Sequence, residues 1–414
     1  MRRLIAATVL LAATFAGLPA AADHAQPRVV SDDPVDWTPH VGDGSVRAIA
    51  VVGDTVVVGG DFSTVTDPSG RTSYDRWFLF AFDRRTGAVR AGFVPDVDGP
   101  VYALAAGPGG TVYAGGAFRT VNGVAQRGLA QLRVAGGERV PAFQAYLNWG
   151  EVRALAAANG SVYAGGTFSA VAGVRRTALA RLDGGSGAVD PGFDARLAAP
   201  RMDRTKVEGL AVSPDGARLV AIGAIGEAAG LPRAQLVMLD AGTGDVADWY
   251  TPVYATRCRS SFDTYLRGVD FAPDGSYFVV VATGRMTGSK RMCDTAARFD
   301  TAGRGGHDPT WVNYTGGDSL YAVSVTGSAV YVGGHQRWMD NPQGHETAGP
   351  GAVSRIGIAA IDPDTGLALA WNPTRSRGVG VRAFAAAAEG LYVGSDTDRL
   401  GHEYHGRIGL FPPG

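Results

Sequence analysis

Histidine is the residue type whose distribution most strongly indicates chemistry in this sequence. The chain contains 7 His, and most of them lie in loop-like stretches: His40, His335, His345, His402 and His405. Two stretches are richest in reactive side chains, GHQRWMDN from Gly334 and LGHEYHGR from Leu400. Because His changes charge near neutral pH and also binds metals, these stretches could serve proton transfer or metal binding.

Three interpretations of these stretches stay open. Acid–base catalysis would place a His or Tyr beside an Arg, and it would use His335, Arg337, His402, Tyr404 and His405. A metal ion, the one cofactor considered, would take His335, His402 and His405, with Glu403 as a further ligand. His-x-x-His in a loop is a weak metal signal, however, and a polar surface without chemistry is the third interpretation.

The same stretches and their surroundings also contain side chains of the types that bind sugars in proteins. Trp338 and Tyr404 offer flat apolar faces, and Trp77 is a third aromatic side chain of this kind, although we expect it to pack between neighbouring sheets. The polar partners would be Asp340, Asn341, Asp396, Asp398 and Glu403. The sequence therefore predicts a candidate ligand site in addition to the catalytic one.

Composition narrows the class of protein. The chain has 414 residues, 45% of them hydrophobic, with 60 Gly and a net charge of −1. Such a balance gives no reason to expect a nucleic acid or an anionic membrane as partner. Its positive charge is mostly Arg, whose planar group suits carboxylate and phosphate ligands.

The N-terminus has the pattern of a secretory signal. A basic start at Arg2-Arg3 precedes an apolar run, and Ala20-Ala21-Ala22 fits the cleavage rule, so residues 1–22 are predicted to be removed. No later run is long enough for a membrane span. The two cysteines, Cys258 and Cys293, are therefore expected to form a disulfide in a secreted, extracellular monomer.

An internal repeat organises the chain after residue 45. One strand-like phrase returns at intervals of roughly 50–60 residues, a spacing typical of repeated supersecondary units. The phrase begins at Val46, Val101, Val152, Val207, Leu266, Leu320 and Val381.

Each unit contains four strand patterns, which we name a to d, and no segment has a helical period. Paired glycines end strand b, as at Gly165-Gly166, and indicate close approach between sheets. The sequence thus predicts an all-β, seven-bladed β-propeller of four-stranded antiparallel blades over residues 46–414. Residues 23–45 would form an N-terminal latch, whose Val35–Pro39 stretch is similar to strand d and would complete the last blade.

The phrase VYAGGTFSAVAG from Val162, followed by LARLD and SGAVDPGF, resembles the repeat of secreted bacterial propellers called delta-60-repeat proteins. Units four and five depart from it, with WD-like or quinoprotein-like turns at Pro214-Asp215-Gly216 and Pro273-Asp274-Gly275. The resemblance implies a propeller fold and a location outside the cytoplasm. It implies little about activity, since propellers support many functions.

The long b–c loops and d–a crossovers lie on one face of such a propeller, where variable loops on a rigid scaffold carry function. We therefore predict a secreted binding or interaction module with its ligand site near blades 6, 7 and 1. The ligand would be an extracellular carbohydrate or protein. The alternative is a polysaccharide hydrolase or lyase that uses the His, Arg and Tyr residues of the same face. An Arg that recurs where strand c begins is expected to be structural.

Overall fold

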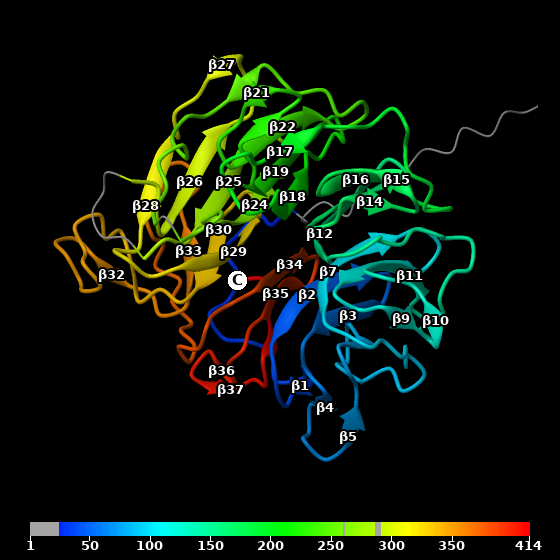
Figure 1. The fold of residues 1–414 in the computed structure, drawn as a ribbon. Coiled ribbons are helices and arrows are strands. Elements are labelled where there is room, and N and C mark those ends of the chain that lie inside the picture. The colour runs from blue at the N-terminus through cyan, green and yellow to red at the C-terminus, as the bar shows by residue number, and fades with distance from the viewer. Residues whose placement is uncertain (1–24, 260, 286–290) are drawn as a thin grey trace, which may run out of the picture.

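The computed structural model describes residues 25–259, 261–285 and 291–414, and every regular element in these ranges is a β-strand (Figure 1). The all-β prediction is therefore confirmed. The predicted signal peptide, residues 1–22, lies outside the described ranges. In the part of the chain that is described, no helix has the length and apolar character to cross a membrane.

An antiparallel sheet recurs along the chain, with its first strand next to its second and its second next to its third. The sheets, in chain order, are β2 (Val46–Val52), β3 (Thr55–Gly60) and β6 (Leu79–Asp83); β7 (Val101–Gly107), β8 (Thr111–Gly116) and β11 (Leu129–Arg133); β12 (Val152–Ala158), β13 (Ser161–Gly166) and β16 (Leu179–Asp183); β18 (Lys206–Val212), β19 (Arg218–Ala224) and β22 (Leu236–Asp240); β24 (Leu266–Phe271), β25 (Tyr277–Ala282), β26 (Thr295–Asp300) and β28 (Trp311–Tyr314); β29 (Leu320–Val325), β30 (Val330–Gly334) and β33 (Ile358–Ile361); and β34 (Ala383–Ala387), β35 (Gly390–Gly394) and β38 (Ile408–Phe411).

Short strands form small outer ladders, and most of them lie between the second and third strands of a unit. They are β1 (His40–Val41), β4 (Thr64–Thr66) and β5 (Ser73–Asp75); β9 (Thr120–Val121) and β10 (Val124–Ala125); β14 (Ala170–Val171) and β15 (Val174–Arg175); β17 (Leu197–Ala198), β20 (Glu227–Ala228) and β21 (Leu231–Pro232); the parallel pair β23 (Trp249–Tyr250) and β27 (Gly305–Gly306); β31 (Trp338–Met339) and β32 (Val353–Ser354); and β36 (Arg399–Leu400) and β37 (Glu403–Tyr404). Most of them therefore lie in the loops that the sequence marks as individual.

The prediction that every repeated sheet has four strands is wrong for most of the described sheets. Among the described sheets, the order β24-β25-β26-β28 has four strands, and the other repeated sheets have three. In those sheets the expected fourth strand is a single bridge, such as Phe82 with Val89 or Leu182 with Val189. The ladder stops because the chain turns at once, with the Phe93 N–H donating to the Arg90 carbonyl, and buries Phe93 completely.

Neighbouring sheets pack face to face, and the apolar cores lie between them. One core joins Val57 and Leu79 of the first sheet to Val112 and Ala114 of the second. The paired glycines lie at these interfaces: a Cβ on Gly165 would come within 2.5 Å of Val207 Cγ1 in the next unit. The close approach that the sequence indicated at these glycines is confirmed.

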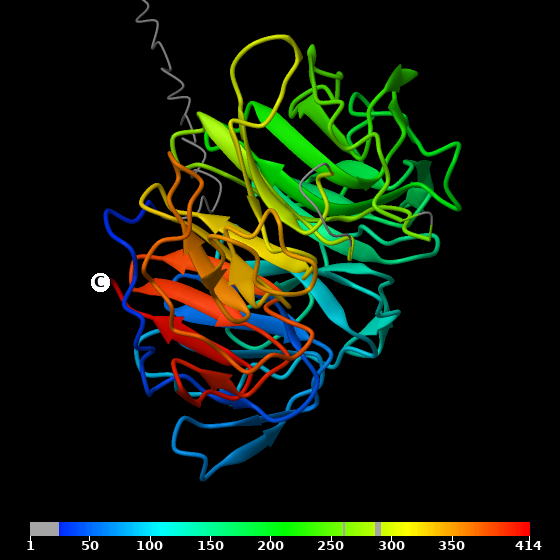
Figure 2. The same cartoon turned by 90° about the vertical axis from the view of Figure 1, so that its left-hand side faces the viewer.

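The first strands of the units gather around the centre of the molecule (Figure 1). Each contacts the next in chain order, and β34 contacts β2. The N-terminal segment runs beside β38, where the Ser31 N–H donates to the Pro412 carbonyl at 2.8 Å and the Val35 N–H donates to Leu410 at 2.9 Å. Figure 2 shows this blue segment beside the red C-terminal strands.

In several units an Arg side chain just before strand c donates hydrogen bonds to backbone carbonyls that follow the strand. Arg176 donates to the Asp190 carbonyl at 2.8 Å, Arg233 to Ala247 at 3.1 Å and Arg355 to Leu369 at 3.2 Å. These hydrogen bonds agree with the structural interpretation of the recurring Arg. In the fifth unit Cys293 occupies that position.

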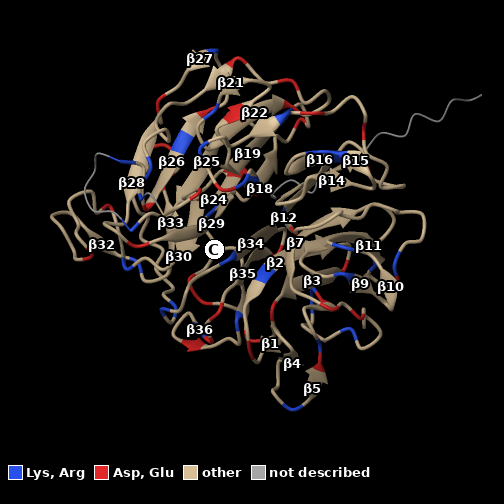
Figure 3. Cartoon of the chain, in the orientation of Figure 1, with Lys and Arg blue, Asp and Glu red and all other residues tan. Residues whose placement is uncertain are grey.

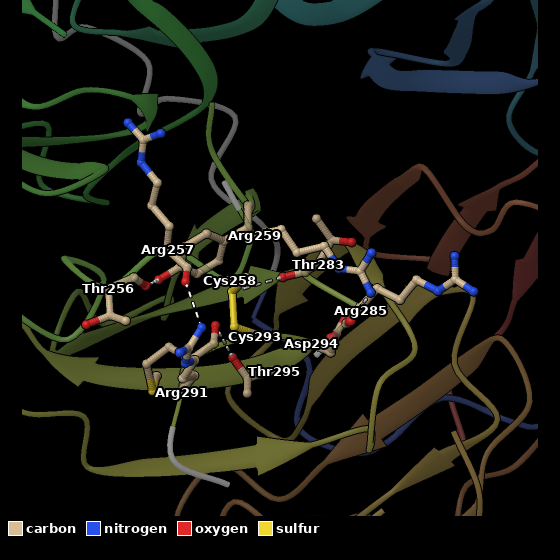
Figure 4. The surroundings of a disulfide bond; sticks show 12 residues. Thr256, Arg257, Cys258, Arg259, Thr283, Arg285, Arg291, Cys293, Asp294 and Thr295 are labelled. Atoms are coloured by element: carbon tan, nitrogen blue, oxygen red, sulfur yellow. Dashed lines mark hydrogen bonds between the residues drawn. A yellow bond between two sulfur atoms is a disulfide. The ribbon is translucent and has the colours of Figure 1, made fainter. Parts of the chain in front are cut away.

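The predicted disulfide between Cys258 and Cys293 is confirmed, with a Cα–Cα distance of 5.8 Å (Figure 4). It joins the crossover before β24 to the segment that enters β26. Arg257, Arg259, Arg285 and Arg291 surround it, and the Arg291 guanidinium donates to the Arg257 carbonyl at 3.1 Å. The covalent bond thus tethers the same place that an Arg tethers in other units.

Substituting Gly165 tests the close packing between sheets. Gly165→Ala should lower the free energy of unfolding by about 1–3 kcal/mol, since the added methyl group overpacks the interface with Val207. Gly92→Ala is the matched control, because its Cβ would meet only the Ala135 carbonyl at 3.7 Å. Denaturant unfolding measures both variants, and an equal loss in the two would contradict the packing argument.

Candidate functional site

Some of the predicted site residues fall into two clusters, together with residues that were not predicted. The first, here called the Asp318 cluster, contains Asp318, His335, Arg337, Trp338 and Arg377. The second, the His40 cluster, contains Thr38, His40, Glu403, Tyr404 and His405. In the described ranges no hydrogen bond or ion pair joins one cluster to the other.

Asp318 is the centre of the first cluster, and its side chain is only 5% exposed. Its carboxylate accepts hydrogen bonds from Arg337 Nε at 2.8 Å and Nη2 at 3.1 Å, a two-point pairing that fixes the guanidinium plane. Arg377 Nη2 donates to the same carboxylate at 3.2 Å. The buried charge is therefore paired with two cations.

Arg337 and His335 present the cluster to the surface. The Arg337 guanidinium lies over the Trp338 ring at 4.4 Å, within the range of a cation–π interaction. His335 Nδ1 lies 2.5 Å from the Gly378 carbonyl, and because a carbonyl only accepts, Nδ1 carries the proton. The Nδ1 contact thereby fixes the orientation of the His335 ring.

The His40 cluster forms where the N-terminal segment meets the hairpin β36–β37. His40 Nδ1 accepts the Gly406 N–H at 3.1 Å, and the exposed Tyr404 ring lies 4.8 Å from the His40 ring. His405 is buried, and its Nε2 lies 3.0 Å from Glu403 Oε1. Burial, followed by the positive charge of His405, lowers the pKa of His40 from its usual value.

Three of the predicted ligand-binding residues hold loops together. Asn341 is fully buried, donates to the Thr315 and Thr347 carbonyls at 3.0 Å and accepts the Gly349 N–H. Asp340 accepts from Asn313 at 2.5 Å and from the Ala368 N–H. Asp396 accepts the N–H groups of Val379 and Gly380. Their polar atoms thus have partners within the protein.

Other predicted residues have exposed side chains. The His402 ring nitrogens lie 3.4 Å from the Thr374 hydroxyl, and the side chains of His345 and Asp398 are also exposed. Trp77 is 60% exposed, so the expectation that it packs between sheets is wrong. Within the described ranges, no group of three or more His, Cys, Asp or Glu side chains could hold a metal ion.

Sequence reasoning missed Asp318, Arg377 and Thr38. Asp318 precedes the phrase that opens the sixth unit, and no motif of the sequence marks it. Its partner Arg337 follows 19 residues later at the end of β30, next to Asp318 in space because β29 and β30 are hydrogen-bonded neighbours. A search for acid and base residues at the two open ends of such a strand pair would have found it.

Comparison with known proteins supports the fold. The family model of a β-propeller domain of unknown function (DUF5122) matches residues 157–193, in the third unit. No curated protein matches the chain. The resemblance to delta-60-repeat proteins stays a prediction.

Two solved structures are similar over most of this chain. The hydrazine synthase of Kuenenia stuttgartiensis has 13% identity, covers 85% of this chain and 92% of its own, and has a TM-score of 0.50. The computationally designed Ika8 protein has 14% identity, covers 92% of this chain and 99% of its own, and has a TM-score of 0.49. At 13% identity the likeness to the hydrazine synthase concerns the fold alone.

His40 should make stability depend on pH. Because its pKa is lower in the folded protein than in the unfolded chain, stability is complete above about pH 6.5 and falls as the pH drops toward the folded pKa. His40→Asn, which keeps an acceptor for Gly406, should flatten this part of the profile. Melting temperatures between about pH 8 and pH 5 measure the effect.

The exposed His402 provides the matched control, because His402→Asn removes a titrating group without a buried partner. Its profile should follow that of the unchanged protein. Parallel profiles for all three proteins would show that His40 does not carry the pH dependence.

Proposed function

We propose that this chain is an exported, seven-bladed β-propeller that binds an extracellular carbohydrate or protein through the Asp318 cluster. The β-propeller domain itself is supported by the family match and the all-β fold. The blade number, the closure, the export and the ligand site are parts of the proposal.

Two observations support seven closed blades. The first strands contact each other in chain order and β34 contacts β2, while Gly394 would collide with Val46 if it carried a Cβ, just as Gly165 would collide with Val207. The N-terminal segment adds backbone hydrogen bonds to β38, which agrees with its predicted role as a latch. The disulfide is compatible with an extracellular protein.

One observation carries the binding proposal: a buried carboxylate holds Arg337 flat over Trp338. This arrangement gives a rigid, partly apolar surface with guanidinium donors at its edge. Sugars stack on such faces, and a side chain held in place loses little entropy on binding. Arg337 and Trp338 thus combine the two features that a carbohydrate site needs.

The geometry favours binding over a hydrolase or lyase. A catalytic set would bring His335 and Arg337 to the same bond as His402, Tyr404 and His405. His405 is instead buried against Glu403 and Thr38, and His402 points to Thr374. Product release from a polysaccharide is therefore an outcome that would overturn this choice.

A panel of extracellular polysaccharides, assayed for retention and for product release, tests the proposal. Trp338→Ala should weaken retention of the bound polymer by about tenfold or more, because it removes the stacking face. Trp149→Ala is the control in another unit: this Trp is 43% exposed, and its Nε1 donates to Ser169. His402→Ala should also behave like the unchanged protein.

Equal retention by Trp338→Ala and the unchanged protein would remove the Asp318 cluster as the binding site. Product release that depends on His335 would favour the enzyme instead.

A further inference from the structure

Apart from the two clusters above, one side chain from each unit lies near the beginning of the unit's first strand, the innermost one. In β2, β7, β12, β18, β24 and β29, the pairing register shifts at the second residue of the repeated phrase. Such a β-bulge turns the side chain of the extra residue, often toward a site. The seventh member, Arg382, donates its N–H to Gly394 just before β34. We call this set the bulge ring: Arg47, Tyr102, Arg153, Glu208, Arg267, Tyr321 and Arg382.

Consecutive members of the bulge ring interact. Arg47 lies over the Tyr102 ring at 5.5 Å, and Arg153 lies over the same ring at 5.2 Å from the other neighbouring unit. Arg382 lies over Tyr321 at 4.2 Å. Tyr102 thus stacks between two guanidinium groups, and the ring residues form one connected group.

Glu208 connects the remaining members. Burial alone would raise the pKa of Glu208, but the positive charges of Lys206, Arg153 and Arg267 lower it below its usual value. The carboxylate therefore stays ionised between two arginines of the ring. Figure 3 shows a basic segment on β2, near the centre of the molecule, as part of this arrangement.

Carboxylates of the protein neutralise only part of the positive charge in the bulge ring. Arg47 pairs with Asp61 at 2.7 Å, Arg153 with Glu151 at 2.6 Å, and Glu208 with Lys206 at 2.6 Å. Arg267 and Arg382, by contrast, form no salt bridge with any described residue. These two arginines leave the excess charge on one side of the ring.

The donors of both arginines are incompletely used. Arg267 donates through Nη1 to the Thr264 and Leu266 carbonyls, while Arg382 Nε is buried without a hydrogen-bond partner. Burial lowers the pKa of Arg382, and the neighbouring charge of Arg47 lowers it further. An anion at this place would supply the missing acceptor and relieve the repulsion.

The surroundings limit how far such an anion could enter the molecule. Two residues further along the strands, Ile49, Leu104, Leu155 and Leu210 form an apolar layer that lines a central cavity of about 380 Å³. The charged layer lies at the strand end that leads into the long loops, since Asp61, the partner of Arg47, directly follows β3. A charged group would therefore stop at the ring, above the apolar layer.

We propose that the bulge ring binds a small, multiply charged oxyanion, a compact polycarboxylate or a phosphate, through Arg267, Arg382 and Arg47. Planar guanidinium groups pair with both carboxylate and phosphate oxygens, and the partly buried position strengthens each charged hydrogen bond. This inference goes beyond the proposed function, because it uses no residue of the Asp318 cluster.

Calorimetric titration with citrate and with inorganic phosphate, at constant ionic strength, tests the site and distinguishes the two ligand sources. The unchanged protein should bind at least one of them with one site per chain. Arg267→Gln and Arg382→Gln should each weaken binding by about tenfold or more. Arg71→Gln is the matched control, because it removes the same charge from an exposed loop of the first unit.

Glu208→Gln should strengthen binding several-fold, since it removes the carboxylate that competes for the ring. A gain of affinity cannot arise from misfolding, so this variant keeps the test decisive if an Arg variant is unstable. The absence of saturable binding by both anions, or an equal loss in Arg71→Gln and Arg382→Gln, would overturn the proposal. Polysaccharide retention by Arg382→Gln reports separately on the Asp318 cluster.

Discussion

The close approach of neighbouring sheets at their inner ends constrains the rest of this structure. Gly165 leaves room there for Val207 of the next unit, and no side chain could be added without moving one of the sheets. Two units solve the same problem differently: where Ile222 and Val281 replace the glycine of the second strand, the residues opposite are Gly209 and Gly268. In each strand pair one of the two facing residues is thus a glycine, which lies in either the first or the second strand.

The β-bulge that precedes this contact follows from the same geometry. A Val or Leu must reach the glycine of the preceding unit while the alanine or glycine after it returns to the ladder, so one residue between them stays unpaired. That residue cannot point into the crowded interface, and its side chain turns to the centre. The packing constraint therefore determines where charged side chains such as Arg382 can gather, although packing does not require them to be charged. Unpaired arginines there oppose stability, which is a cost typical of sites that bind something.

The sequence predicted what is repeated and local. The period, the strand phrases, the glycine pairs and the Cys258–Cys293 disulfide all follow from residues near each other in a unit or from a pair with one possible partner. It did not predict partners across units or within folded loops. Asn341 was expected to bind a ligand, but its side chain bonds to Thr315 and to Gly349 of its own loop. Trp77 was expected to pack between sheets, but it is exposed. Arg337 was predicted as a site residue because it is an arginine in a histidine-containing loop. Its orientation, however, depends on a hydrogen bond to Asp318, which no sequence motif marks.

The N-terminal segment explains why part of the histidine signal has a structural origin. The Trp371 indole donates to the Ser31 carbonyl at 2.9 Å, and the Val30 N–H donates to the Tyr331 hydroxyl at 2.9 Å, so the segment is attached to the sixth unit as well as to β38. The chain then reaches the β36–β37 hairpin, where Thr38 and His40 meet His405 and Gly406. Buried polar groups at such a junction need partners of their own, and the imidazoles supply them. His335 lies outside this junction and is half-buried beside Arg337. The histidine-rich stretches in this fold therefore differ in origin: the histidines of this junction have structural partners, and the proposed binding site uses His335.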